Sequence, residues 1–215
     1  MSTFVIFGAG GRAGRQVVAE ARRRGHQVTA VVRDPSRYGG LTDDGVRIVA
    51  GDVTDAADVA ALAVGHDAAI NTAAVYGEGT DPDAFFTGAA HALVKGLGQA
   101  GVDRLVTVGL SVVLAGPDGT RLLDAPVFPA EFRPFGLAHA AGLEVLRGEG
   151  AALDWVYVSP VGDFDHEGER TGDYDIREHG DMEARISYAD FALALLDEAE
   201  TPRHRHSHLA VTARD

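Results

Sequence analysis

The chain has 215 residues, of which 19 are basic and 32 are acidic, so its formal charge at pH 7 is −13. This length suits one well-buried core, and the negative charge excludes nucleic acid and anionic membrane surfaces as principal partners, because both would be repelled. Cysteine is absent, which excludes disulfides and thiolate metal sites. No run of the sequence approaches the roughly 20 apolar residues that span a bilayer. We expect a soluble, cytoplasmic protein with small-molecule partners.

Short apolar runs alternate with stretches that carry apolar residues three or four positions apart and mostly end on glycine. The runs are apolar on both faces, as in strands of a buried parallel sheet. This alternation predicts an α/β fold with a right-handed, doubly wound parallel sheet in one domain, residues 1–215. Strands are expected at 4–8, 27–32, 46–50, 68–73, 104–109 and 153–159, and helices at 12–25, 55–65, 81–101 and within 130–150.

The C-terminal quarter has a different texture. Residues 160–186 are polar, acidic and rich in turn-forming residues, which predicts an irregular insertion over the carboxyl edge of the sheet. A helix is expected at 186–200, with Ser187 as its N-cap, and a last strand at 206–213. The histidines of that last segment lack interleaved carboxylates, so we predict no metal site there.

Glycines recur immediately after the first expected strand. Gly8, Gly11 and Gly14 have the spacing GxxGxxG and stand between a strand and a helix, which is the context of a dinucleotide-binding turn. Without side chains, the turn lets backbone N–H groups and the positive end of the helix reach an anionic pyrophosphate. The predicted cofactor contacts of this turn are Gly8, Ala9, Gly10, Gly11, Arg12, Ala13 and Gly14.

Two later stretches bear on the adenosine end of such a cofactor. The second strand ends in VVRDPSR, which places Arg33 where NAD enzymes usually carry a carboxylate for the ribose hydroxyls. A guanidinium there favours a 2′-phosphate, with Arg12 and Arg37 as further donors, and therefore predicts a preference for NADP(H). Asp34 leaves NAD(H) open. After the third strand, GDVTD offers Asp52 for the adenine amino group and Val53 for the adenine ring.

Seven segments resemble the NAD(P)H-binding group of atypical short-chain dehydrogenase/reductases, which has NmrA-like and flavin or biliverdin-IXβ reductase-like members. They are FGAGGRAGR, VVRDPSR, GDVTDAADV, INTAAV, LDWVYVSPVGDF, GERTGDY and ISYADFALALLDEAETPRH, and together they extend along nearly the whole chain. The resemblance implies a Rossmann core with strand order 3-2-1-4-5-6, often with a seventh strand, and a nicotinamide over the ends of strands four to six. The residues implied at that end are Thr72, Ala73, Ala74, Ser111, Ser159, Pro160 and Val161.

Catalytic residues are where the sequence departs from the wider superfamily. Its typical members use a Tyr and a Lys four residues later, yet residues 111–153 contain neither. Phe135 and His139 have that spacing instead, and a phenyl ring cannot transfer a proton. Tyrosine-dependent alcohol or sugar chemistry is therefore disfavoured.

Two functions remain open on the sequence. The first is reduction of a small conjugated acceptor, flavin-like or quinone-like, with Ser111 bonding an acceptor oxygen. His139, which we expect to titrate near neutrality, would supply the proton. The second is a non-catalytic NAD(P)H sensor that acts through a protein partner. The chain would be a monomer or a homodimer, and the sequence does not decide between them.

Overall fold

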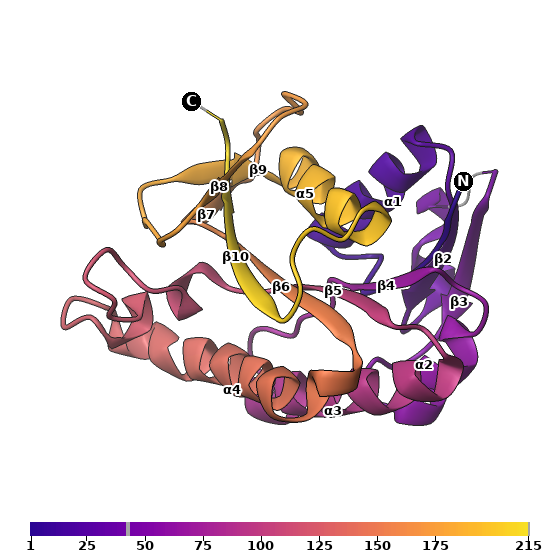
Figure 1. The fold of residues 1–215 in the computed structure, drawn as a ribbon, viewed down its shortest axis with the longest axis horizontal. Helices are drawn as coiled ribbons and strands as arrows, with labels where there is room; N and C mark the ends of the chain where they lie inside the picture. Colours follow the sequence, from indigo (N-terminus) through magenta and orange to yellow (C-terminus); the bar gives the residue numbers. More distant parts are fainter. Residues whose placement is uncertain (42–43, 215) are drawn as a thin grey trace.

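The computed structural model describes residues 1–41 and 44–214. An eight-stranded sheet runs through the protein, with helices on both faces (Figure 1). Its order is β3-β2-β1-β4-β5-β6-β10-β8, and every neighbouring pair is parallel except β10 and β8. The strands are β1 (Thr3–Phe7), β2 (Gln27–Val32), β3 (Val46–Ala50), β4 (Ala68–Asn71), β5 (Arg104–Val108), β6 (Asp154–Pro160), β7 (Asp163–Asp165), β8 (Asp175–Arg177), β9 (Arg185–Ser187) and β10 (Ser207–Thr212).

Helices cover the sheet in two groups. One face is covered by α1 (Arg12–Arg23) and α5 (Tyr188–Glu200), and the other by α2 (Ala56–Ala63), α3 (Pro82–Ala100) and α4 (Arg133–Glu149) (Figure 1). Short 3₁₀ turns join them: η1 (Pro35–Arg37), η2 (Gly39–Leu41), η3 (Ser111–Val113), η4 (Leu122–Asp124), η5 (Ala130–Phe132) and η6 (Gly150–Ala152).

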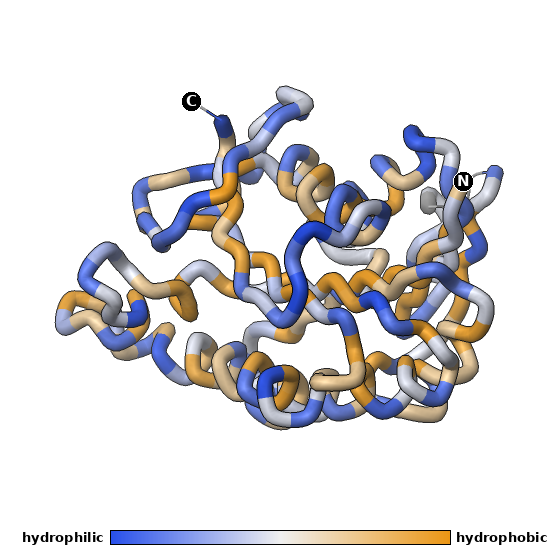
Figure 2. Tube along the Cα trace, viewed as in Figure 1, coloured by the Kyte–Doolittle hydropathy of each residue, from blue (hydrophilic) through white to orange (hydrophobic). Residues whose placement is uncertain are grey.

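Each helical layer encloses its own apolar core. The central strands are mainly hydrophobic, as Figure 2 shows, and their side chains pack alternately against the two groups of helices. The predicted α/β class and the strand order 3-2-1-4-5-6 are confirmed, with β10 as the seventh strand. This arrangement brings the carboxyl ends of β1, β4, β5 and β6 to one edge of the sheet.

The polar region after β6 is more regular than the sequence predicts. Instead of an irregular insertion over 160–186, it contains β7 and β9, which pair in parallel, and β8, which adds an antiparallel edge to β10. Each of these strands has three residues, too few to show the alternation that marks a strand in sequence.

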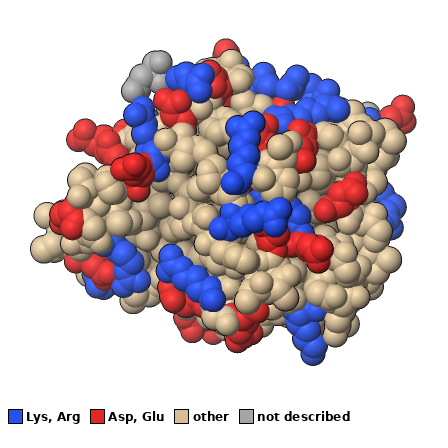
Figure 3. Space-filling model, in the orientation of Figure 1, with Lys and Arg blue, Asp and Glu red and all other residues tan. Residues whose placement is uncertain are grey.

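Charged side chains of both signs are interspersed over the face seen in Figure 3. Among residues 1–41 and 44–214, no helix combines the length and the apolar character that crossing a membrane requires.

A buried carboxylate ties α1 to its surroundings. Glu20 is 4% exposed and accepts hydrogen bonds from Arg23 (2.6 Å), Arg24 (2.8 Å) and Arg170 (3.3 Å). Burial alone would raise the pKa of Glu20, but these arginines outweigh it and lower that pKa from 4.5 to about 2.

The Glu20 carboxylate is expected to make folding stability depend on acid pH. Because its pKa is lower in the folded protein than in the unfolded chain, its contribution of about 3 kcal/mol is complete above about pH 4.5 and is lost as pH falls towards 2. The free energy of unfolding, measured with urea across this pH range, should therefore change more steeply with pH in the wild type than in Glu20→Gln. Glu144→Gln, which removes an exposed partner of Arg147, is the control and should change stability by less than about 1 kcal/mol. Parallel pH curves for Glu20→Gln and the wild type would contradict this assignment.

Candidate functional site

The glycine-rich turn packs directly against the end of β4. Gly8 has φ +74°, and a Cβ there would lie 2.5 Å from the Ala73 backbone. A Cβ on Gly14 would lie 2.3 Å from the carbonyl oxygen of Gly8 and 2.8 Å from Thr72 Oγ1. The turn therefore requires glycine at both positions, because the opposing atoms are mostly backbone.

The hydroxyl of Thr72 holds this turn in place. It donates to the carbonyl oxygens of Phe7 (2.9 Å) and Gly8 (3.1 Å), so it joins the end of β4 to the end of β1. Thr72 was predicted to line the reactive end of a cofactor. Its hydroxyl is committed to the glycine turn, so a cofactor at this point would meet the backbone or the methyl group of Thr72.

Helix α1 begins without a side-chain cap. Asp55, Asp81 and Ser187 accept hydrogen bonds from first-turn amides of α2, α3 and α5. The N-cap of α1 is Gly11, which has no side chain to accept such bonds, and the first turn of α1 carries no acidic residue. Helix α4 also has no side-chain cap, but it continues directly from η5. The first-turn N–H groups of α1 have no side-chain acceptor and can donate to an anionic ligand. The amide of Ala9 is already used, since it donates to the Val31 carbonyl oxygen at 3.2 Å.

Tyr38 covers the β2 side of the turn, a contact that the sequence did not suggest. Its ring carbons lie 2.3 to 2.9 Å from where a Cβ on Gly10 would stand, so Gly10 leaves room for the ring. The guanidinium of Arg15 lies 5.7 Å from the Tyr38 ring centroid, and its Nε donates to the Gly10 carbonyl oxygen at 2.9 Å. Ring and guanidinium together fix the outer wall of the turn.

Arg33 and Asp34 differ in how far their side chains are committed. The Asp34 carboxylate caps η1, where it accepts from the backbone N–H (3.1 Å) and the hydroxyl (2.6 Å) of Ser36. These bonds lower the pKa of Asp34 below its usual value. Arg33 is exposed, and its guanidinium has no hydrogen bond or ion pair within the described part of the chain.

The two residues predicted around the adenine are less available. One carboxylate oxygen of Asp52 accepts from the Thr54 backbone N–H (2.9 Å) and hydroxyl (2.7 Å), which closes a local turn. Val53 is 6% exposed and packs into the core beneath the sheet. Little of its surface is therefore open to an adenine ring, and its contact with the ring stays a prediction.

The predicted nicotinamide end brings some of its residues together and buries others. Ala73 is partly exposed and Ala74 exposed at the end of β4. Ser111 opens η3 after β5 and is 5% exposed, and its hydroxyl has no hydrogen bond with any other residue of the described ranges. Pro160 ends β6, and the next residue, Val161, is 3% exposed, so both are walls of the core rather than open surface.

Ser159 is turned into the protein. It is fully buried, and its Oγ lies 2.8 Å from Nε2 of His208 on β10. The prediction that Ser159 lines the reactive end is thus corrected for its side chain. Ser159 belongs to a layer of polar side chains below the strand ends. Gly109 has no side chain and so leaves room there for Ser159 Oγ and the Tyr157 ring.

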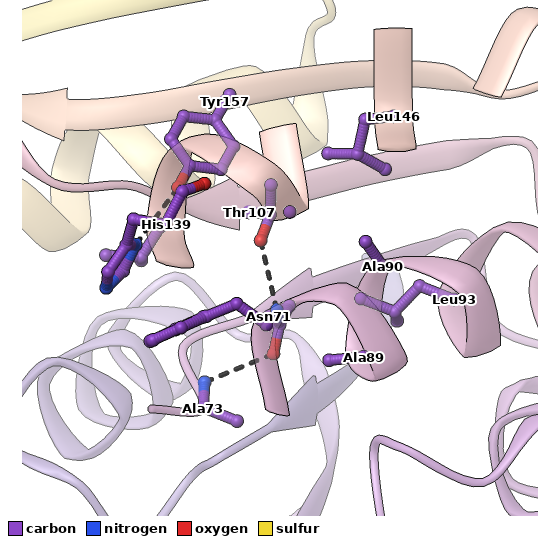
Figure 4. A pocket seen from close by; sticks show the side chains of 12 residues that line it. Asn71, Ala73, Ala89, Ala90, Leu93, Thr107, His139, Leu146 and Tyr157 are labelled. Atoms are coloured by element: carbon purple, nitrogen blue, oxygen red, sulfur yellow. Dashed lines mark hydrogen bonds between the residues drawn. The ribbon is translucent and has the colours of Figure 1, made fainter. Parts of the chain in front are cut away.

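That layer crosses four strands in register. Asn71, Thr107, Tyr157 and His208 are successive partners on β4, β5, β6 and β10. Asn71 donates to Thr107 Oγ1 (3.0 Å) and accepts from the Ala73 backbone N–H (3.1 Å), as Figure 4 shows. A cavity of about 20 Å³ lies between this row and helices α3 and α4, with room for about one water molecule.

His139 faces the same cavity (Figure 4). Its Nδ1 lies 3.1 Å from the hydroxyl of Tyr157, its ring lies 3.7 Å from that of Phe86, and it is 5% exposed. Burial lowers the pKa of His139 to about 3, so the imidazole is neutral at pH 7. The expectation that His139 titrates near neutrality is wrong, because the face of α4 that carries it packs against the sheet.

Three aromatic rings, those of Tyr76, Phe135 and Phe86, lie in contact beside this layer, and we call the surface around the exposed Tyr76 ring the mouth. Tyr76, on the loop after β4, is 70% exposed and lies 5.2 Å edge-on to Phe135, which in turn lies 5.7 Å from Phe86. Next to Phe135, a Cβ on Gly136 would lie 3.0 Å from the side chain of Val112, so α4 packs closely on the turn that begins with Ser111. The free hydroxyl and the exposed ring therefore belong to neighbouring elements.

The comparison with protein families agrees with this geometry. A family model described as NAD(P)H-binding matches residues 8–202, from the first glycine of the turn to just beyond α5. The chain belongs to the NAD(P)H-binding family. The resemblance inferred from the sequence is confirmed. The glycine-rich turn and the uncapped start of α1 are compatible with a dinucleotide of this kind, because the free first-turn N–H groups can donate to its phosphates.

Similar proteins match nearly the whole length of the chain. The uncharacterized protein YwnB of Bacillus subtilis is 34% identical over 219 residues, which cover 97% of each chain. A structure from Bacteroides thetaiotaomicron, proposed to be an epimerase, is 29% identical, with a TM-score of 0.85 over 100% of this chain and 98% of the other. One from Streptococcus pneumoniae, proposed to be an NADH-flavin reductase, is 30% identical, with a TM-score of 0.80 over 100% of both chains.

Proposed function

We propose that the protein is an NADPH-dependent reductase that transfers hydride to a small, planar, conjugated acceptor of the flavin or quinone class. The observation that carries this proposal is the composition of the mouth. Aromatic rings border it, and the adjoining turn η3 carries the buried Ser111, whose hydroxyl is uncommitted within the described ranges. At the spacing of the usual Tyr and Lys, the chain has a phenyl ring and a neutral, buried imidazole. Such a mouth suits an acceptor whose electron-poor ring takes hydride without a phenolic acid beside it.

The roles of the residues follow from their positions. The cofactor supplies the hydride. The exposed ring of Tyr76, held against Phe135, offers a face on which a planar acceptor stacks. The Ser111 hydroxyl donates to an acceptor oxygen. No hydrogen bond to another residue of the described ranges has to break for this. Since His139 is neutral, water supplies the proton.

The preference for NADPH is supported by the contrast between Arg33 and Asp34. A carboxylate that binds ribose hydroxyls needs free oxygens, and Asp34 already uses one on Ser36. The guanidinium of Arg33, which has no partner in the described part of the chain, suits a 2′-phosphate instead. We further propose a cytoplasmic location, where NADPH is available and a chain without cysteine needs no disulfides.

An acceptor scan tests the proposal. NADPH oxidation by the purified protein is followed with FMN, a benzoquinone and dichloroindophenol, and turnover is expected with at least one of them. With that acceptor, Ser111→Ala should lower kcat by about 3- to 10-fold, which is the loss of one neutral hydrogen bond, and leave NADPH affinity unchanged. Tight NADPH binding without turnover on any acceptor would reject the reductase.

A second candidate is a nucleotide sensor that passes its redox state to a protein partner. It is favoured by the apolar side chains left exposed around α4, namely Val127 (91%), Phe132 (49%) and Leu137 (44%). A sensor requires the partner to bind the reduced and the oxidised complexes with different affinity. Equal affinity in the two states would exclude it.

A further inference from the structure

A single buried carboxylate holds the segment that follows β7. We call residues 166–172 the clamp loop. Asp190, in the first turn of α5, is 1% exposed and accepts from the backbone N–H and hydroxyl of Thr171 (both at 3.0 Å) and the backbone N–H of Gly172 (2.9 Å). The Ser187 hydroxyl is a fourth donor, at 3.0 Å. A buried charge with this many donors fixes its partners firmly, because each bond is charge-assisted.

The clamp loop reaches α1 and the glycine turn. Nε of Arg170 lies 3.3 Å from the Glu20 carboxylate, and Nδ1 of His166 lies 2.8 Å from an Nη of Arg12, the first residue of α1. The ring of His166 also contacts the ring of Tyr188, edge to face, with 5.5 Å between their centroids. A residue of the cofactor turn is thus held by a loop that lies 154 positions away in the chain.

The chemistry of the contact fixes its direction. A guanidinium has only donors, so His166 accepts at Nδ1 and carries its proton on Nε2. Arg12 uses one Nη in this bond, and its Nε and other Nη have no partner in residues 1–41 and 44–214. Those two groups form the fork that binds phosphate oxygens in a bidentate manner.

We propose that His166 and Asp190 are positioning residues for cofactor binding: Asp190 fixes the clamp loop, and His166 on that loop orients Arg12 towards the phosphate oxygens of the dinucleotide. The inference rests on the cofactor binding of the family and not on the proposed reduction of an acceptor. It holds whether the protein is a reductase or a sensor.

Calorimetry with the full chain tests the inference through NADPH and NADH affinity. His166→Ala is expected to weaken NADPH binding by about 5-fold, since Arg12 loses its orienting bond. His166→Asn should restore affinity to nearly that of the wild type, because its Oδ1 stands close to the position of Nδ1. A loss confined to NADPH assigns Arg12 to the 2′-phosphate, and an equal loss for NADH assigns it to the pyrophosphate, and both support the proposal.

The decisive comparison is made in an Arg12→Ala background. There, His166→Ala should cause no further loss of affinity, because no guanidinium remains to be oriented. Asp190→Asn, where it folds, should likewise cause no further loss in the Arg12→Ala background. His166 is exposed, so it can be replaced without disturbing the core. Unchanged NADPH affinity in His166→Ala, or full additivity of His166→Ala with Arg12→Ala, would overturn the proposal. Neither result depends on finding an acceptor.

Discussion

Replacing Gly14 by alanine is expected to lower the free energy of unfolding by about 1 to 3 kcal/mol, the usual cost of overpacking a close contact. The added methyl would lie 2.3 Å from the carbonyl oxygen of Gly8 and 2.8 Å from the Cα of Ala9. Both are backbone atoms, so the turn itself must move rather than a flexible side chain. Because the first amides of α1 move with it, cofactor affinity should fall by at least about tenfold, equivalent to 1.4 kcal/mol.

Gly98→Ala is the matched control for Gly14→Ala. Gly98 also lies in a helix, α3, but it is exposed and a Cβ there meets nothing within 4 Å. Alanine is the better helix former, so Gly98→Ala should stabilise the protein by about 0.5 to 1 kcal/mol and leave cofactor binding unchanged. Urea unfolding and calorimetry with NADPH measure both quantities. Wild-type affinity in Gly14→Ala would show that the turn does not hold the cofactor.

The glycine turn and the strand order are the features that could be predicted from the sequence. The turn at Gly8, Gly11 and Gly14 is a local pattern, and the strand and helix that flank it are read from the same few residues. The strand order then follows from the regular alternation of strands and helices, because right-handed crossovers leave few arrangements.

The errors at the reactive end have one physical origin. Strand β6 is apolar on both faces, so its sequence shows no alternation of apolar and polar residues. The face of the sheet on which the Ser159 side chain lies therefore could not be inferred. Helix α4 likewise carries small residues on several sides, which left His139 without an evident buried face. The contact of His166 with Arg12 joins two distant segments through an exposed loop, and no periodicity in the chain could indicate it.

Arg33→Ala is expected to lower the ratio of NADPH to NADH affinity by about 10- to 150-fold, because a charge-assisted hydrogen bond contributes about 1.5 to 3 kcal/mol. The side chain is exposed and unpaired among the described residues, so its removal breaks no internal contact and stability should be unchanged. The NADPH-to-NADH affinity ratio of Arg33→Lys should lie between those of the wild type and Arg33→Ala, since an ammonium keeps the charge and loses the planar fork. Competitive binding of the two cofactors gives the ratio directly.

The control for net charge is Arg203→Ala, which also removes one exposed arginine, from the segment between α5 and β10. If general attraction of a more negative cofactor were responsible, Arg203→Ala would lower the ratio as much as Arg33→Ala. A local 2′-phosphate contact predicts no change in Arg203→Ala and little salt sensitivity of the remaining ratio in Arg33→Ala. An unchanged ratio in Arg33→Ala would remove the case for NADPH, and the ribose would then have to be bound by Asp34, whose carboxylate would first have to release Ser36.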